Sequence, residues 1–462
     1  MQGMTIDYDH LQELIKEGKL IEALRVGLAI FRENTSNLNL WFEVANLCLQ
    51  LDERKTGVEG LIGAGRELAE NGSLPMAIVC IRTIEEAGED ASELTRHVSA
   101  LFGKDSNRVR NRAMPVPPLP PTVDEAMLAQ VKGDKAALLA EAARVLMQAD
   151  EAAKLASAMR SVHPPVPYFP LFGMLSAGNF ARLVSCFSPK RFYRDELLIK
   201  QGDASSDFYL LARGEIKVFI AEKIQDEGGL TQQMRFKHVA TLGPGTFVGE
   251  MGIVARTPRS ANVQAVSGGT LLGASLESIE KLAAEIPEVA DIIVAYCEVR
   301  LLENVMSASP ILLPIESEDE RAAALRHFER LYVPAGNIII REGQPASGIY
   351  VVVSGEVGIT KLGAPPKEIS LKDSQTGKMI FITALSSGDI VGEISTVMKK
   401  PATATVHAIT DTSLLFLPKE RFMEFTKTYP GVFQRIYEIV ESREEDIAKI
   451  LSTKAAPGDD LL

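Results

Sequence analysis

The chain has 462 residues, of which 46% are hydrophobic and 24% are charged, an ordinary globular composition that excludes a wholly disordered or fibrous protein. Acidic side chains outnumber basic ones, 61 to 49, and the net charge of -12 disfavours binding to nucleic acid backbones and anionic lipids. The longest apolar runs, Met76–Ile81 and Ile292–Cys297, are far shorter than the roughly 20 residues of a membrane-spanning helix. With no secretory signal in view, we expect a cytoplasmic protein of three or four domains.

Residues 1–105 are predicted to form helices, because apolar side chains such as Leu11, Leu14, Leu24 and Leu28 recur at helical spacing. Short turns at Gly18 and Gly72 each precede a further helix, a pattern of antiparallel helical hairpins. These turns resemble those of tetratricopeptide-type repeats, although their 54-residue separation fits a 34-residue period only with a degenerate repeat between them. A plain helical bundle is the alternative. Either form predicts a docking domain for an unknown protein partner.

Residues 106–165 are predicted to be a proline-rich linker followed by a helix at about Val123–Ser161. The arginines within residues 108–112 are compatible with docking of an acidic or phosphorylated partner, and the prolines with a recognition motif. We favour a solvated spacer over both.

The remaining chain contains one domain twice. Gly202 and Gly343 lie 141 positions apart, and Gly249 and Gly392 lie 143 apart. Each copy, 166–305 and 306–450, has short strands separated by glycine turns and then a helical stretch, and residues 451–462 form an acidic tail. The expected fold class is therefore an α + β multidomain chain: an all-α helical-hairpin region followed by two tandem β-rolls, jelly-roll-like and flanked by helices.

The segment 243–263 of the first copy has the features of an anion pocket. Gly249 lets a ligand approach the backbone, and the residues after it can form a helical turn whose free N–H groups point at an anion. Arg259 supplies a planar fork of donors for phosphate oxygens, and Ser260 adds a hydroxyl. Glu250 fits beside a phosphate if the ligand also offers a hydroxyl, as a ribose does. The pattern predicts a phosphorylated sugar.

This segment resembles the phosphate-binding cassette of cyclic-nucleotide-binding domains. The resemblance covers about residues 169–305 and implies a β-roll in which Arg259 and backbone amides hold the cyclic phosphate and Glu250 holds the ribose. The expected ligand is cAMP or cGMP, with no other cofactor, no metal and no catalytic group. The candidate ligand-binding residues are Gly249, Glu250, Met251, Gly252, Arg259, Ser260 and Ala261.

The second copy aligns with the first without a gap across this segment, but Ala402 stands where the first copy has Arg259. Lys399 and Lys400 are expected to face solvent, and a flexible ammonium does not replace a guanidinium fork. We therefore predict that this copy binds no cyclic nucleotide tightly and acts as an interaction or dimerisation module. Its degenerate site comprises Gly392, Glu393, Ile394, Ser395, Ala402, Thr403 and Ala404.

In the resembling family, the helix after the β-roll closes over the ligand, a role that here falls to Ser275–Val305. By helical spacing, Tyr296, Val299 and Leu302 are the candidate lid residues, with packing as the alternative for all three.

The sequence thus predicts a non-enzymatic cyclic-nucleotide sensor that relays its ligand state to a partner through helical segments. One alternative is the inhibitory regulatory subunit of a cyclic-nucleotide-dependent protein kinase, for which Arg110–Met114 is a poor match to an inhibitor segment. Another is a protein-binding scaffold with vestigial pockets. A transcription factor fits less well, because no helix-turn-helix follows the second copy.

Overall fold

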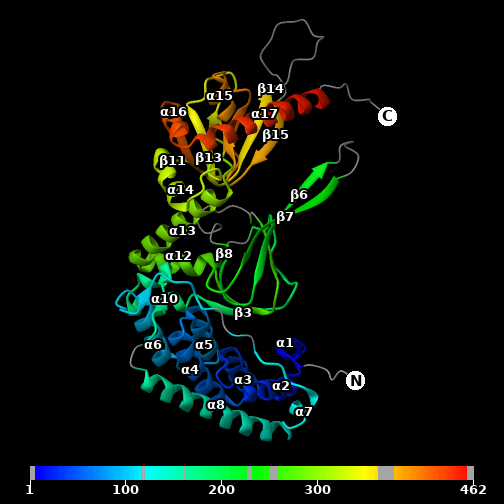
Figure 1. Cartoon of the computed structure of the whole chain (residues 1–462), viewed down its shortest axis with the longest axis vertical. Helices are drawn as coiled ribbons and strands as arrows, with labels where there is room; N and C mark the ends of the chain where they lie inside the picture. The colour runs from blue at the N-terminus through cyan, green and yellow to red at the C-terminus, as the bar shows by residue number, and fades with distance from the viewer. Residues whose placement is uncertain are drawn as a thin grey trace. The chain divides into compact units, whose positions relative to one another are not determined.

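The computed structural model describes residues 6–115, 118, 120–160, 163–204, 207–225, 232–249, 259, 261–362 and 379–454 (Figure 1). The chain divides into two compact units: the first holds the described residues up to Tyr296, and the second holds those from Cys297 onward. Among the described helices, none is long and apolar enough to cross a membrane.

The chain begins with six helices, each packed against the next: α1 (Tyr8–Lys16), α2 (Leu20–Glu33), α3 (Leu38–Gln50), α4 (Arg54–Glu70), α5 (Leu74–Glu86) and α6 (Ser92–Phe102). The predicted helical-hairpin region is confirmed. Positive-φ residues close the α1–α2, α3–α4 and α5–α6 turns at Gly18, Asp52 and Gly88, spaced 34 and 36 positions apart. Gly72 lies in the α4–α5 turn, which joins two hairpins, so its distance from Gly18 is not a repeat length. The tetratricopeptide resemblance stays a prediction.

The segment after α6 contains a helix where one is predicted, but the linker before this helix is not solvated throughout. The segment contains β1 (Val109–Arg110), α7 (Glu125–Leu128), α8 (Lys135–Met159) and β2 (Val166–Pro167), and β1 pairs in parallel with β2. Arg108 donates from Nη1 to Glu70 Oε2 at 2.7 Å and from Nη2 to the Pro164 carbonyl at 2.9 Å. The spacer prediction is therefore wrong for Arg108, because a buried carboxylate on α4 holds its guanidinium.

The first β-roll follows α9 (Pro170–Gly173) and α10 (Ala177–Val184) and precedes α12 (Leu276–Glu285) and α13 (Pro287–Ala308). Pro287 divides the predicted stretch Ser275–Val305 into these last two helices. Two four-stranded antiparallel sheets form the roll, in the orders β3-β10-β5-β8 and β4-β9-β6-β7. Their strands are β3 (Ser188–Phe192), β4 (Leu197–Ile199), β5 (Phe208–Arg213), β6 (Ile216–Gln225), β7 (Gln232–Leu242), β8 (Phe247–Val248), β9 (Asn262–Ala265) and β10 (Gly269–Ala274).

The second β-roll repeats this topology strand for strand, in the orders β11-β18-β13-β16 and β12-β17-β14-β15, which confirms the duplication. Its strands are β11 (Glu329–Val333), β12 (Ile338–Ile340), β13 (Gly348–Ser354), β14 (Val357–Leu362), β15 (Met379–Leu385), β16 (Ile390–Val391), β17 (Thr405–Ala408) and β18 (Thr412–Pro418). Its helical elements are α14 (Glu318–Ala324), the 3₁₀ turn η1 (Leu325–His327), α15 (Glu393–Met398), α16 (Lys419–Thr428) and α17 (Pro430–Lys454), so the predicted acidic tail starts as helix.

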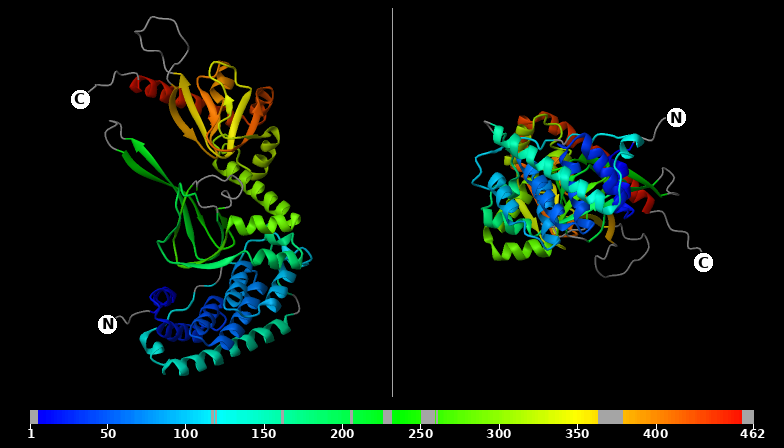
Figure 2. Two further views of the ribbon diagram at one scale, coloured as in Figure 1. Left: turned by 180° about the vertical axis from the view of Figure 1, so that it is seen from behind. Right: turned by 90° about the horizontal axis from the view of Figure 1, so that it is seen from below.

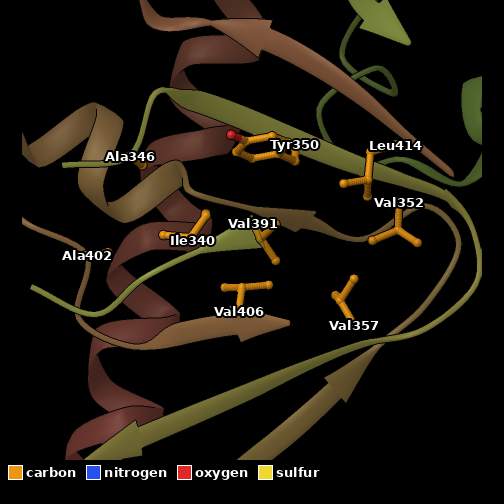
Figure 3. Close-up of a cluster of buried hydrophobic side chains, with 9 residues drawn as sticks. All are labelled: Ile340, Ala346, Tyr350, Val352, Val357, Val391, Ala402, Val406 and Leu414. Atoms are coloured by element: carbon orange, nitrogen blue, oxygen red, sulfur yellow. The ribbon is translucent and has the colours of Figure 1, made fainter. Parts of the chain in front are cut away.

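Equivalent side chains fill the two rolls. Leu211, Val248 and Val263 lie in the core of the first roll, and Val352, Val391 and Val406 occupy the matching positions of the second (Figure 3). Most of their neighbours along the strands are buried as well, so both faces of β5 and β13 are covered. The shared core makes the differences between the two cassettes directly comparable.

A buried ionic cluster joins the helical region to the first roll. Glu43 of α3 is fully buried, and its Oε2 accepts from Arg191 Nη2 on β3 at 2.7 Å, while its Oε1 lies 2.7 Å from Arg213 Nη2 on β5. Tyr8 and Gln12 of α1 also donate to Glu43 Oε1, at 2.9 and 3.1 Å. Burial alone would raise the pKa of Glu43, but the two guanidinium groups outweigh it and hold that pKa well below its usual range.

Replacement of Glu43 by glutamine should destabilise the first unit by about 3–5 kcal/mol, because it leaves two guanidinium groups buried without their counter-charge. Urea denaturation of the full chain, followed by tryptophan fluorescence from Trp41, measures this. The control is Glu13→Gln on the exposed face of α1. Equal stability losses in the two variants would contradict the prediction.

The contacts of Glu70 predict that the fold loses stability at acidic pH. Contact with the His97 ring at 3.2 Å opposes the effect of burial, and together with Arg108 it lowers the pKa of Glu70 to about 2. Because the unfolded-state pKa is about 4.3, this carboxylate stabilises the fold above that pH and loses its contribution as the pH falls toward 2. In Glu70→Gln, the free energy of unfolding should fall less steeply between about pH 4 and 2 than in the parent. Identical slopes would contradict the assignment.

Candidate functional site

Arg259 lies buried between two strands of the first roll, with 7% of its surface exposed. Its Nη1 donates to the Gly249 carbonyl at 3.0 Å, just after β8, and its Nη2 donates to the Asp207 carbonyl, just before β5. These two acceptors fix the plane of the guanidinium. The structure thus places a buried, permanently charged donor group where the sequence predicts the phosphate fork.

Gly249 is needed at this point for two reasons. Its φ of +84° lies in the left-handed region, which side chains with a Cβ rarely adopt. A Cβ there would lie 2.5 Å from Arg259 Nη1 and 3.0 Å from the Asp207 carbonyl oxygen. Any larger residue would therefore displace the guanidinium.

The other predicted residues of this cassette divide into two groups. Ala261 is half-buried directly before β9. Four residues lie outside the described part of the chain: Glu250, Met251, Gly252 and Ser260. For these, the assignments from the sequence stay predictions.

Sequence reasoning missed Asn262, which supports the loop beside Arg259. Its Oδ1 accepts from the Gln201 N–H at 3.1 Å, while the backbone of Arg259 bonds to Gly202 and Asp203 at 2.8 and 2.9 Å. The second roll makes the equivalent contact with a different side chain, since Thr405 Oγ1 accepts from the Glu342 N–H at 3.1 Å. The signal in the sequence was a polar residue at the first position of the strand in both copies.

Of the three predicted lid residues, Tyr296 has an identified contact. Its ring meets the Phe247 ring edge-on with centroids 5.2 Å apart, and Phe247 in turn stacks on Phe208. Val299 is exposed and Leu302 is half-buried, and both belong to the second unit. Tyr296 thus packs beside β8, directly before Gly249, and the lid role of all three residues stays a prediction.

The second cassette has the same backbone but different chemistry. Gly392 has a φ of +86° and precedes α15, as expected for a helical turn after the glycine. Ala402 is 8% exposed and belongs to the apolar core in Figure 3, together with Ile340 and Ala346. An apolar methyl group therefore stands where the first roll has a guanidinium. Lys399 and Lys400 are exposed, as predicted.

The remaining residues of the second cassette are engaged within the roll. Glu393 is 3% exposed and accepts from Arg443 Nη1 of α17 at 2.7 Å. Ser395 Oγ accepts from the Ala346 N–H at 3.0 Å and donates to the Lys400 carbonyl at 2.5 Å. Ile394 and Ala404 are buried and Thr403 is half-buried.

Comparison with known proteins agrees with this geometry. The family described as cyclic nucleotide-binding domain matches residues 189–285 and 330–429. The type II regulatory subunit of cAMP-dependent protein kinase from Drosophila melanogaster is 22% identical over 285 residues, covering 62% of this chain and 66% of that protein. The regulatory subunit from Aspergillus fumigatus is 26% identical over 270 residues, covering 57% and 59%. The chain thus spans less than two thirds of the length of these relatives.

Other matches also cover a little over half of this chain. Lysophospholipase NTE1 of Pyricularia oryzae is 22% identical over 285 residues, which is 57% of this chain but 18% of that enzyme. Among solved structures, the regulatory domain of Toxoplasma gondii PKA with cAMP covers 60% of this chain and 92% of that one, at 20% identity and a TM-score of 0.26.

The family matches fall on the two β-rolls, and the two rolls share one strand order and one core. Each of the two β-rolls thus matches the cyclic nucleotide-binding domain family.

Proposed function

We propose that the first β-roll binds cAMP or cGMP through Arg259, that the second roll binds neither, and that the helical region transmits the ligand state to a protein partner. The observation that carries the proposal is the buried guanidinium of Arg259, held by two backbone carbonyl oxygens, at a position where the second roll has Ala402. In this proposal the chain is a regulatory protein, and no catalysed reaction is assigned to it.

A cyclic phosphate fits the chemistry of the first pocket. A guanidinium has five N–H donors in a fixed fork whose geometry matches phosphate oxygens, and the Gly249 and Asp207 carbonyl groups hold that of Arg259 in place. The site is buried, so the charge is weakly screened and attraction to a phosphate is strong. One local cation of this kind is compatible with a chain whose net charge is -12.

The proposed ribose contact depends on Glu250. Its counterpart in the second roll, Glu393, belongs to the part of the chain that the structure describes. Glu393 is almost fully buried and accepts a hydrogen bond from a donor of the same roll. A carboxylate at this position therefore acts as an inward-facing acceptor. We expect Glu250 to accept from a ribose hydroxyl in the same way.

Transmission through the helical region is supported by the cluster around Glu43. Arg213 and Asp207 lie at opposite ends of β5, so the strand that receives Arg259 also carries one of the two guanidinium groups bound to the helical region. A change at the pocket that moves β5 has to be accommodated at this interface, because buried ion pairs tolerate little displacement. The proposed partner-binding element is the six-helix region.

A kinase-inhibiting subunit, the alternative, needs an accessible arginine-rich segment. Here Arg110 Nη1 donates to the Asn107 and Val109 carbonyl groups, and Arg112 Nη1 donates to the Pro165 carbonyl at 3.2 Å. Both side chains are nevertheless exposed, and the alternative is disfavoured because Arg110 and Arg112 are not adjacent, as the two arginines of an inhibitor segment are.

Arg259→Ala should weaken cAMP or cGMP binding by roughly thirty- to several-thousand-fold, because truncating one member of a buried charged pair costs about 2–5 kcal/mol. Isothermal titration calorimetry of the parent and the variant with each nucleotide measures the loss and also ranks the two ligands. The control is Arg235→Ala, an exposed arginine on β7 of the same roll. Binding unchanged by Arg259→Ala, or absent from the parent, would refute the proposal.

Gly249→Ala should weaken nucleotide binding by at least roughly tenfold, because the new methyl group meets the Arg259 guanidinium and the φ is strained. Gly243→Ala, in the loop before β8, is the control: its Cβ would meet no atom within 4 Å. Fluorescence anisotropy with a labelled cyclic nucleotide compares the two variants. Equal affinities would show that the Gly249 contact does not shape the pocket.

A further inference from the structure

Helix α8 lies across one face of the helical region, as both figures of the whole chain show (Figures 1 and 2). It contacts α2, α3 and α4, and its buried side chains are Leu138, Ala142, Val145, Leu146 and Ala149. The surface beneath is shaped for a helix, since a Cβ on Gly60 of α4 would come within 3.1 Å of Leu146 Cδ1. We call this face of α2, α3 and α4 the α8 surface.

The α8 surface is basic at its edges. Arg32 of α2 donates from Nε to Glu141 Oε1 at 3.0 Å, and Arg66 of α4 lies 3.8 Å from Asp150 Oδ1. Arg25 of α2 donates to the carbonyl groups of Val131 and Gly133, just before α8, at 2.7 and 2.9 Å. The helix that fits this surface is therefore amphipathic, with small and branched apolar residues on one face and carboxylates at the positions of Glu141 and Asp150.

The connections of α8 to the rest of the chain allow this helix to detach from the α8 surface. The segment that contains α8 begins after β1 and ends before β2. Because β1 and β2 pair with each other, both ends of this segment are fixed at one place. Lifting α8 breaks neither that pairing nor the packing of α1 to α6 on one another. The packing of α8 on this surface is also incomplete. No residue after Ala149 in α8 is buried, and Leu155 and Met159 are 64% and 77% exposed.

We infer that the α8 surface is the docking site for an acidic amphipathic helix of a partner protein, and that α8 occupies this site until the partner displaces it. This names the surface and the chemistry of the partner proposed above, and it stands whether or not the first roll binds a cyclic nucleotide. A helix laid in a groove with apolar anchors at i, i+4, i+7 and i+8 is a common mode of peptide recognition.

The test uses the full chain and a fluorescein-labelled synthetic peptide of residues 134–150 as the probe. Leu146→Asp, on the buried face of α8, should free the surface, and the chain should then bind the peptide saturably. Met147→Asp, on the neighbouring position that is 57% exposed, is the control and should bind no peptide, like the parent. Circular dichroism verifies that both variants are folded.

Exchanging the charges of the Arg32–Glu141 pair tests whether the peptide binds to the α8 surface. Adding Arg32→Glu to the Leu146→Asp chain should reduce peptide affinity at least roughly tenfold, and a peptide with Glu141→Arg should restore it. A folded Leu146→Asp chain that binds no peptide, or binding that ignores the charge exchange, would overturn the inference.

Hydrogen exchange of the unmodified chain gives a readout that depends on no variant. The backbone amides of α8 should exchange at least roughly tenfold faster than those of α3 and α4, because α8 opens without unfolding the helices beneath it. Exchange of α8 at the same rate as α3 and α4 would overturn the inference, since α8 would then be an inseparable part of the helical core.

Discussion

Two backbone carbonyl groups hold the guanidinium of Arg259 in the first β-roll, and the chemistry of the chain depends on this contact. The acceptors lie at the adjacent ends of two paired strands, at Gly249 after β8 and at Asp207 before β5. A glycine at 249 is required, because a side chain there would occupy the space of the guanidinium. The second roll keeps the glycine, the helical turn and the core, but Ala402 completes an apolar cluster instead. Duplication of one domain has therefore produced one cassette built around a buried guanidinium and one with the methyl group of Ala402 in its place.

The same strand, β5, connects the charged cassette to the rest of the first unit. Arg213 at its end reaches Glu43 of α3, and Arg191 of β3 reaches the same carboxylate. A cluster so fully buried is costly to separate, so the helical region and the first roll behave as one body. In this arrangement, the helical region is an integral part of the nucleotide-binding unit and carries a surface that the chain itself covers with α8. The proposed docking surface and the proposed ligand site thus lie in the same compact unit.

Much of the fold was predictable, because it follows from repeated patterns. The similar offsets of 141 and 143 positions between Gly202, Gly249 and their counterparts revealed the duplication, and helical periodicity revealed the helices of residues 1–105. The interactions between distant segments were not predictable. Nothing local marks Glu43 as the partner of Arg191, 148 positions later, and a proline-rich stretch gives no sign that Arg108 pairs with Glu70. Within the site, the type of residue at 259 and 402 was informative by itself, whereas the supporting role of Asn262 depends on a contact with Gln201 that only the folded chain reveals.

The most direct test of the central claim is the number of cyclic nucleotides that one chain binds. Equilibrium dialysis of the purified chain with radiolabelled cAMP, repeated with cGMP, should saturate at one nucleotide per chain for the preferred ligand. A value of two would show that the apolar cassette around Ala402 also binds. A value of zero with both nucleotides would show that the buried guanidinium of Arg259 does not make a nucleotide site.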